Sequence, residues 1–460
     1  MKFSSHFDKV ALGTIFIFSF FLLGMFLVGD FTLPRIQYFN AATGEVSPQQ
    51  GQFLFRFNRL MNEKTVEQGF SIVPAVKGQF SWSGRTFAFT AIEPLQYGAH
   101  YTLVFRGAED RAGKKMEPVT FQAHTRPESV LFLDSEGQIV QLNLASAERK
   151  SISPANLFIQ QFSISPDGNF VAFLGANRHL SDFQDRTNFR LSVLKLSDQS
   201  VTSLPIDAHV SLDNIHWLPD ASAVAFSYVD MKSNKEGLRL YELNTRIITE
   251  LAPGKARAYD FYFTPDSAQV AYIDTNGALI LGAVPSGNGS LVATTFTEMS
   301  GFSASGDRLG YILPRSVDPF DLSNVPVLVD ADGNEERLPV PTESTSFDVT
   351  FVPNQTKVVF TLEESLGSIR KNTIYSYDYA TKKQEKLINN DTCTAVQPSV
   401  SPDASLIVWQ CVRNDNKGYL ITGWNDYQGK MVTAELWLKD LMTGEERNLG
   451  VMGAQVQFVP

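Results

Sequence analysis

The chain is short of basic residues relative to acidic ones. Its 460 residues include 39 Lys and Arg against 49 Asp and Glu, which gives a formal net charge of −10. A protein that binds nucleic acid needs a basic surface to neutralise phosphates, and no basic stripe is present. The composition therefore argues against a nucleic-acid partner.

Recognisable catalytic motifs are also missing. The sequence has no HExxH, CxxC or GxSxG motif and no phosphate-binding glycine loop, and it has only 6 histidines. His179, His209 and His216 fall in neighbouring segments, but His216 lies within a strand pattern, and we do not expect a metal cluster there. We predict that the protein is not an enzyme and holds no cofactor or metal.

Helical periodicity is weak after residue 30, and residues that favour strands dominate, which predicts an all-β fold. The exception is VALGTIFIFSFFLLGMFLVG at residues 10–29, an uncharged run of the length that crosses a bilayer as a helix. Lys2 and Lys9 precede it, which places residues 1–9 in the cytoplasm. We predict a single-pass signal anchor in the cell membrane with the bulk of the chain outside. A cleaved signal peptide is the alternative.

A short motif recurs along the C-terminal two thirds of the chain. Its clearest copy is FSISPDGNFVAF at residues 162–173, in which Pro166 fixes φ and Gly168 accepts a positive φ, as a turn between two strands requires. A repeat of about 40–50 residues with several short strands is typical of propeller blades. The equivalent turns stand at Pro219, Pro265, Ser305, Pro353 and Pro402.

These motifs resemble the repeats of the TolB-like, or PD40, β-propeller family, and the resemblance covers residues 129–460. FSISPDG at 162–168 and VSPD at 400–403 match the turn of the family, and LRLYEL at 238–243 matches its third strand. ASGD at 304–307 and Asn354 depart from the motif. Because the motif is a structural turn, the resemblance implies a fold and names no activity.

We predict seven blades in this propeller. The segment at residues 129–152 contains three strands but no turn motif in front of them, whereas residues 454–460 resemble the strand that approaches such a turn. Pairing this C-terminal strand with the first blade would close the ring and remove an open sheet edge. Six blades is the alternative, if the unit at 301–313 is not a blade.

Residues 34–126 predict an immunoglobulin-like β-sandwich. About seven short strands fit this length, and apolar and polar residues alternate clearly in FLFRF at 53–57. The segment resembles the bacterial SbsA-type Ig-like domain, which implies a spacer or adhesion module of a surface protein. Asp110 is interpreted as part of a turn and not of a metal loop. The residues that carry the resemblance are FNRLM at 57–61, Trp82, FAF at 87–89, DRAG at 110–113 and the strand at 121–125.

Long loops on one face of the propeller are the predicted binding surface, because binding residues are often carried on loops of a rigid scaffold. The predicted long loops are residues 176–188, 229–237, 314–324, 363–372 and 413–432. The longest one could instead fold back on itself as a hairpin. The candidate binding residues are the aromatics Phe183, Phe320, Tyr419, Trp424 and Tyr427.

The two cysteines, Cys393 and Cys411, lie about nine residues on either side of Pro402 in the last turn. Antiparallel pairing about that turn would bring them within reach of a disulfide. Secretion would make the bond chemically reasonable, and two reduced buried thiols are the alternative.

The combined features predict a membrane-anchored, extracytoplasmic binding or scaffold protein of the cell envelope. The expected partner is an envelope or secreted protein held by the looped face. The alternative is a glycan-binding or glycan-cleaving propeller with wall polysaccharide as its partner.

Overall fold

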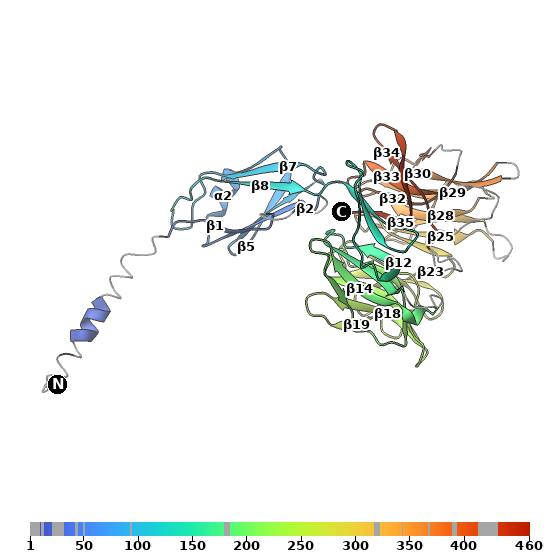
Figure 1. Cartoon of the computed structure of the whole chain (residues 1–460), viewed down its shortest axis with the longest axis horizontal. Coiled ribbons are helices and arrows are strands. Elements are labelled where there is room, and N and C mark those ends of the chain that lie inside the picture. The colour runs from blue at the N-terminus through green and yellow to red at the C-terminus, as the bar shows by residue number, and fades with distance from the viewer. Residues whose placement is uncertain are drawn as a thin grey trace. The chain divides into compact units, whose positions relative to one another are not determined.

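Strands make up almost all of the regular structure in the computed structural model of the protein (Figure 1). The all-β class is therefore confirmed. One compact unit comprises Met1–Val46, Gln52–Ile92 and His100–His124, and the other comprises Ser47–Gly51, Glu93–Ala99 and Thr125–Pro460. The structure describes residues 10, 13–20, 32–41, 45–48, 51–92, 94–178, 185–316, 323–342, 344–366, 369–388, 393–412 and 431–460.

The predicted transmembrane helix at residues 10–29 is wrong for the part of this segment that the structure describes. Residues 13–20 are helical. Within the described residues, no helix has both the length and the apolar character needed to cross a membrane.

Two four-stranded sheets form the first unit, with strand orders β1-β3-β6-β5 and β2-β8-β7-β4. The short helix α2 (Glu63–Gly69) and strand β2 (Glu45–Val46) were not predicted. The other strands agree in number with the seven short strands expected from the sequence: β1 (Ile36–Phe39), β3 (Gln52–Phe57), β4 (Phe70–Val73), β5 (Gly78–Ser83), β6 (Thr86–Ala91), β7 (His100–Phe105) and β8 (Val119–Thr125).

Phenylalanines fill the space between these two sheets. Phe53, Phe55 and Phe57 alternate along β3 and are fully buried, because successive residues of a strand face opposite sides. Phe55 stacks on Phe39 at 4.5 Å between ring centroids and meets Phe105 edge-on at 4.8 Å. This aromatic core explains why a sandwich of this size tolerates such short strands.

Asp110 closes a turn in this unit. One carboxylate oxygen accepts hydrogen bonds from the backbone N–H groups of Ala112 and Lys114 at 2.9 and 2.8 Å, and the other pairs with Arg59 at 2.9 Å. Burial opposes ionisation, but the hydrogen bonds outweigh it and lower the pKa of Asp110. The side chain is thus committed to the turn, as predicted from the sequence.

The second unit is built from sheets in which consecutive strands pair antiparallel. Five four-stranded sheets hold β12–β15, β16–β19, β20–β23, β24–β27 and β28–β31, and a seven-stranded sheet has the order β11-β10-β9-β35-β34-β33-β32. The inner strands are β12 (Leu157–Ile164), β16 (Val210–Trp217), β20 (Tyr262–Phe263), β24 (Glu298–Phe302), β28 (Ser346–Phe351), β32 (Thr394–Val400) and the end of β35 (Glu446–Phe458), which pairs with β9 (Ser129–Leu133).

The remaining strands complete these sheets toward their outer edges, and a single 3-10 turn, η1 (Arg186–Asn188), precedes β14. They are β10 (Ile139–Asn143), β11 (Arg149–Ser151), β13 (Phe170–Asn177), β14 (Arg190–Lys195), β15 (Val201–Ser203), β17 (Ala223–Asp230), β18 (Lys235–Glu242), β19 (Ile248–Leu251), β21 (Gln269–Ile273), β22 (Leu279–Ala283), β23 (Gly289–Ala293), β25 (Arg308–Pro314), β26 (Asn324–Asp330), β27 (Glu335–Arg337), β29 (Lys357–Leu366), β30 (Ile369–Asp378), β31 (Lys383–Lys386), β33 (Leu406–Val412) and β34 (Ala434–Asp440).

The prediction of seven separate blades needs correction. The described part of the second unit contains five four-stranded sheets and one seven-stranded sheet, because the predicted first and last blades share β35. The early residues of this 13-residue strand pair with β34, whereas Ala454, Gln457 and Phe458 pair with β9. The C-terminal strand does join the two ends of the propeller, and it does so by merging two blades.

Four of the six recurring turns share one hydrogen-bond arrangement, which starts from a hydroxyl at Ser165, Thr264, Ser303 or Ser401. In the first, the Ser165 hydroxyl donates to Asp167 at 2.5 Å and accepts from the N–H of Phe170 at 2.9 Å. Ser401 repeats this with Asp403 and the N–H of Leu406. One residue of each turn is left-handed, with φ between 54° and 74°: Gly168, Ala221, Ser267, Gly306, Asn354 and Ala404. The left-handed residue stands two positions after the proline in the turns at Pro166, Pro219, Pro265 and Pro402, and directly after the proline in the turn at Pro353.

Two of the predicted long loops are in fact hairpins. Asp230 of β17 pairs directly with Lys235 of β18, so only a tight turn remains of the loop at 229–237. The loop at 363–372 is replaced by the ends of β29 and β30, whose ladder continues to Leu366 and Ile369. Polar residues misled the prediction at both places, because a sheet ladder needs backbone pairing and tolerates polar side chains on exposed strands.

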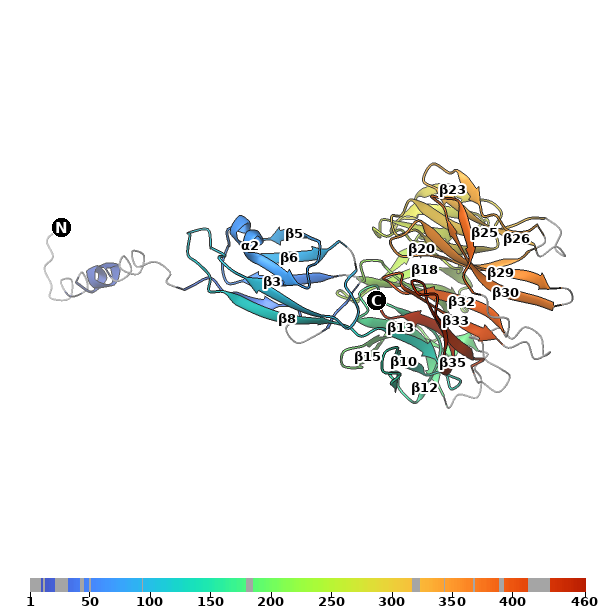
Figure 2. The same ribbon diagram turned by 90° about the horizontal axis from the view of Figure 1, so that it is seen from above.

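Arg126 fastens the C-terminus to the first recurring turn within the second unit (Figure 2 shows this unit from above). Its guanidinium donates to the carbonyl oxygens of Asp167 and Pro460, each at 3.2 Å, and also to that of Gly168. The hydroxyl of Tyr97 donates to the carbonyl of Val459 at 3.2 Å. These bonds hold the end of β35 against β12.

We expect Arg126→Ala to lower the free energy of unfolding by about 2 kcal/mol, since it leaves several partly buried carbonyl groups without a charged donor. The free energy of unfolding of Arg126→Lys should lie between those of the wild type and Arg126→Ala, because a single ammonium group cannot reach all of these carbonyl oxygens. Chemical denaturation followed by tryptophan fluorescence measures the change. Lys150→Ala, at an exposed position of β11, is the control, and a loss no larger than that of the control would contradict this role for Arg126.

Candidate functional site

A polar residue stands at an irregular position in most inner strands. The pairing register of β16 shifts between Asp213 and Ile215, and that of β32 shifts between Val396 and Ser399. Such bulges remove a residue from the ladder and redirect its side chain. The residues taken out of the ladders are left-handed, with φ between 44° and 54°, at Asn214, Asp348, Gln397 and Gln455.

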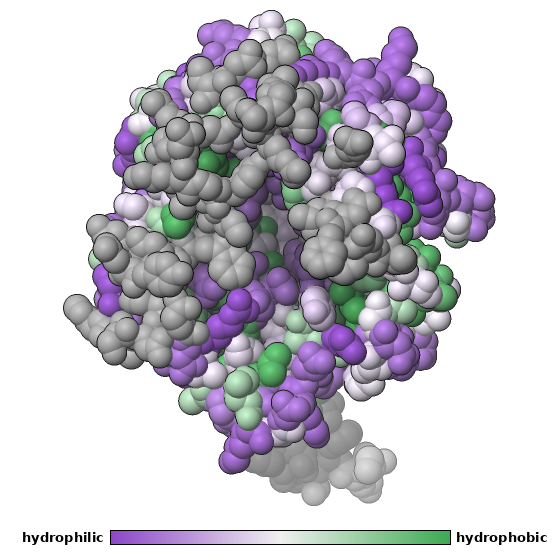
Figure 3. Space-filling view, turned by 90° about the vertical axis from the view of Figure 1, so that its right-hand side faces the viewer, coloured by the Kyte–Doolittle hydropathy of each residue, from purple (hydrophilic) through white to green (hydrophobic). Residues whose placement is uncertain are grey.

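These bulges surround a cavity of about 820 Å³ at the centre of the second unit. Inner strands β12, β16, β20, β24, β28, β32 and β35 all contribute to its wall, and most consecutive inner strands contact one another. Figure 3 shows a recess in one face of this unit, bordered in part by hydrophilic residues. The polar residues of the wall are Gln160, Gln161, Arg186, Asp213, Asn214, Tyr262, Glu298, Ser300, Asp348, Thr350, Gln397, Ser399, Gln455 and Gln457.

The wall is acidic on one side and rich in amides on the other. Glu298 on β24 and Asp348 on β28 are carboxylates of adjacent inner strands, and Asp260 precedes β20. Strands β32, β35, β12 and β16 instead supply the amides. The ring of strands thus carries its unbalanced negative charge on one arc.

Burial and mutual repulsion change the acidity of this arc. Desolvation, followed by the charges of Asp348 and Asp260, raises the pKa of Glu298 to about 7. Desolvation also raises the pKa of Asp348, although a 3.1 Å hydrogen bond from the N–H of Gln397 opposes the shift. The pKa of Tyr262 is raised well above its usual value by burial and then by Asp260, so its hydroxyl stays protonated.

Nearby cations are already engaged. Arg186 of η1 pairs with Asp213 at 2.5 Å, and the His216 ring nitrogen lies 2.7 Å from Asp260. In the described part of the chain, neither Glu298 nor Asp348 has an ion pair with Lys, Arg or His. The described residues therefore supply no ion-pair partner for either carboxylate.

Several amides of the opposite arc are held by the backbone. Gln455 donates to the carbonyl of Gln160 at 2.8 Å, and Gln457 donates to that of Phe162 at 3.2 Å. Gln410, which is fully buried, donates to the side-chain oxygen of Gln397. These contacts orient the amide groups before any ligand arrives.

The histidines considered from the sequence do not form a site in the described residues. His209 lies 3.4 Å from Asp230 and His216 pairs with Asp260, while His179 lies outside the described residues. Among the described residues, no group of three His, Cys, Asp or Glu side chains is arranged to hold a metal ion.

All five aromatic candidates for the binding surface lie outside the described residues: Phe183, Phe320, Tyr419, Trp424 and Tyr427. Sequence reasoning missed the wall of the cavity instead. A signal for it was present, because Gln161, Asn214, Asp260, Asp348, Gln397 and Gln455 each stand four positions before the first residue of a turn motif or its C-terminal equivalent. A polar residue at a fixed place in successive apolar strands indicates a shared environment.

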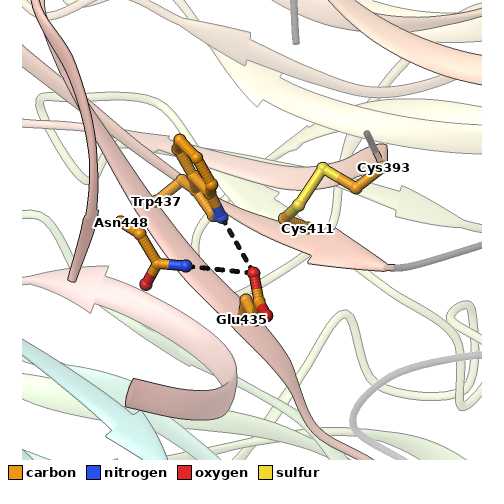
Figure 4. The surroundings of a disulfide bond; sticks show 5 residues. All are labelled: Cys393, Cys411, Glu435, Trp437 and Asn448. Atoms are coloured by element: carbon orange, nitrogen blue, oxygen red, sulfur yellow. Dashed lines mark hydrogen bonds between the residues drawn. A yellow bond between two sulfur atoms is a disulfide. The ribbon is translucent and has the colours of Figure 1, made fainter. Parts of the chain in front are cut away.

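Cys393 and Cys411 are joined by a disulfide, with 5.4 Å between their Cα atoms (Figure 4). The bond connects the residue before β32 to the end of β33, and these two strands pair with each other. Beside it, Glu435 accepts hydrogen bonds from the Trp437 ring at 3.3 Å and from Asn448 at 3.0 Å. Both cysteines are buried, at 3% and 2% exposure.

Residues 30–125 match the family of bacterial Ig-like domains, which confirms that part of the sequence prediction. The SbsA type is a finer assignment that this match does not make. A comparison with curated protein sequences found no match.

The fold is similar to solved β-propeller structures at low identity. Oligogalacturonate lyase from Vibrio parahaemolyticus is 16% identical with a TM-score of 0.47, and the match covers 70% of this chain and 84% of the lyase. TolB from Acinetobacter baumannii is 11% identical with a TM-score of 0.42, and the match covers 85% of this chain and 83% of TolB. The β-propeller domain of the trilobed protease from Pyrococcus furiosus is 13% identical with a TM-score of 0.48, and the match covers 81% of this chain and 98% of that domain.

The prediction that the protein is not an enzyme is not upheld, because the solved structures of similar fold include a lyase. At these identities the likeness shows the fold and assigns no activity to this chain. Missing sequence motifs supported the prediction, but a propeller can assemble a reactive site from residues of separate blades, which leaves no local motif.

Reduction of the disulfide should destabilise the protein. For a separation of 18 residues, loop-closure entropy predicts a loss of about 3 kcal/mol. Chemical denaturation of the oxidised protein and of Cys393→Ala/Cys411→Ala measures it. Peptide mapping without reductant should find the two cysteine peptides joined, and free alkylation of both would contradict the bond.

Stability should fall as pH rises through the titration of Glu298. Its pKa is about 7 in the folded protein against an ordinary value of 4.5 for glutamate, so the folded state binds more protons between these pH values and loses stability as they leave. Solvent in the cavity screens the effect, which we expect to stay near 1 kcal/mol. Unfolding midpoints at pH 5.5 and pH 8 should differ less in Glu298→Gln than in the wild type. The exposed Glu148→Gln is the control, and equal differences in all three proteins would refute the assignment.

Proposed function

We propose that this protein is an extracytoplasmic binding scaffold that holds a protein partner at the central cavity of its propeller. The observation that carries the proposal is the cavity itself, a space of about 820 Å³ whose wall is polar and comes from all of the inner strands around it. Binding sites are usually concave and largely formed in advance.

The wall favours binding because its parts are fixed before a partner arrives. Gln410, Ser227 and Thr361 are fully buried behind the inner strands, and Asn214 bonds to Ser227 at 3.4 Å. A site that is already ordered loses little conformational entropy on association. The bacterial Ig-like domain fits a scaffold role, since such modules separate functional parts in surface proteins.

An extracytoplasmic location is supported by the disulfide between Cys393 and Cys411. Such bonds persist in oxidising compartments and are rare where thiols are kept reduced. The cell envelope is therefore the proposed place of action, and an envelope or secreted protein is the proposed partner.

A glycan ligand is the second candidate. It is favoured by the amides of Gln160, Gln397 and Gln455 in the wall, since amide groups can both donate to and accept from sugar hydroxyls. The same cavity would then receive a segment of wall polysaccharide.

We expect the full chain to retain a defined protein from solubilised envelope extract, and Ser300→Trp to lose it. Ser300 lines the cavity, so a tryptophan there occupies the binding space. Ser290→Trp, exposed on the outer strand β23, is the matched control and should bind like the wild type. Quantitative mass spectrometry of the eluates measures retention.

Purified wall polysaccharide is offered in parallel to the same three proteins. Retention of polysaccharide alone, with loss in Ser300→Trp, would replace the protein partner with the glycan. Equal retention by wild type and Ser300→Trp would show that the cavity is not the binding site.

A further inference from the structure

Within the described residues, two carboxylates of the cavity wall have no ion-pair partner. Glu298 and Asp348 come from neighbouring inner strands, and Arg186, which also lies in the wall, pairs with Asp213. A ligand that brings positive charge would compensate these carboxylates in a partly desolvated space, where electrostatic attraction is stronger than in water.

Unmatched acceptors give a second and separate indication. The side-chain oxygen of Gln161, in the wall, is enclosed and accepts no hydrogen bond from the described residues. The side-chain oxygen of Gln410 also accepts no hydrogen bond from the described residues. Gln410 is 0% exposed, and its amide nitrogen donates to Gln397 of the wall. Buried acceptors without donors are costly, so their presence points to a ligand, or the water it displaces, that supplies N–H or O–H groups.

We propose that the cavity binds the basic side chain of a protein partner, with Glu298 and Asp348 recognising its guanidinium or ammonium group. This inference rests on the proposed function and adds the chemistry of the partner. Arginine fits best, because its planar group carries five donors and always keeps its charge. The carboxylates would compensate the positive charge of the side chain, while the amides of the opposite arc would form hydrogen bonds with the neighbouring peptide groups of the partner.

A sugar or a metal ion would satisfy fewer of the polar groups in the cavity wall than a basic side chain would. A sugar would satisfy the amides but leave two neighbouring carboxylates uncompensated. A metal ion would need a set of three His, Cys, Asp or Glu ligands, and none was found among the described residues.

The affinity should depend on pH. The groups around Glu298 are Asp348, Asp260 with its partner His216, the protonated Tyr262, and the Arg186–Asp213 pair. Since the pKa of Glu298 is about 7, lowering the pH from 8 to 6 protonates it and should weaken binding by about tenfold.

Isothermal titration calorimetry of the full chain with acetyl-tetra-arginine amide tests the proposal. We expect binding that weakens by about tenfold or more in Glu298→Gln/Asp348→Asn, which keeps the shape of both side chains and removes their charge. Glu148→Gln, on an exposed turn, should bind like the wild type. The uncharged acetyl-tetra-citrulline amide should not bind.

The proposal is overturned if tetra-arginine does not bind, or if the double variant binds it as well as the wild type while both proteins show the same near-ultraviolet circular dichroism. Binding of spermine without binding of the peptide would overturn the assignment to a protein side chain. Retention of an envelope protein by the wild type with no arginine binding would refute this inference alone. Arginine binding without any retained protein would instead refute the proposed function.

Discussion

The propeller depends on one strand that belongs to two ladders. The first half of β35 completes the sheet of β32–β34, and its last residues pair with β9, more than 300 positions earlier in the chain. No local contact can substitute for this pairing, because it joins the two ends of the unit. Arg126 and Tyr97 secure the strand at its final carbonyl groups. Closure of this kind also removes the free edges at which sheets add further strands.

Closure is what gives the cavity its wall. The inner strands are brought side by side only when the two ends of the unit meet, and each then presents its bulge to the same space. A bulge costs ladder hydrogen bonds and needs unusual backbone angles, as at Asp348 and Gln397. The protein also keeps two carboxylates there against burial and repulsion. Features that reduce stability and converge on one cavity are characteristic of sites that serve function.

Local chemistry was readable from the sequence because it acts over a few residues. Ser165, Asp167 and Gly168 form a turn from their own hydrogen bonds and backbone freedom, and the strands on either side follow. Asn354 stands at the aspartate position of its turn and is itself left-handed, which asparagine tolerates, whereas the left-handed residue of the first turn is Gly168, one position later. The alternating phenylalanines of β3 likewise predicted a buried face that the structure contains. The prediction of a membrane-spanning helix at residues 10–29 relied on the length of an apolar run, and the predictions of loops at 229–237 and 363–372 relied on runs of polar residues. These predictions failed.

The sequence by itself determined the all-β class, the strands of the Ig-like domain and the recurring turns, since each depends on neighbours along the chain. Tertiary structure alone decided that Glu298 and Asp348, about fifty residues apart, face one cavity together with Gln161 and Asn214. It also decided that β35 merges two blades. In the sequence each of these residues is a single polar position in an apolar strand. Their common environment exists only after the ring has closed, because the distances among them are set by strand pairing between sheets and not by spacing along the chain.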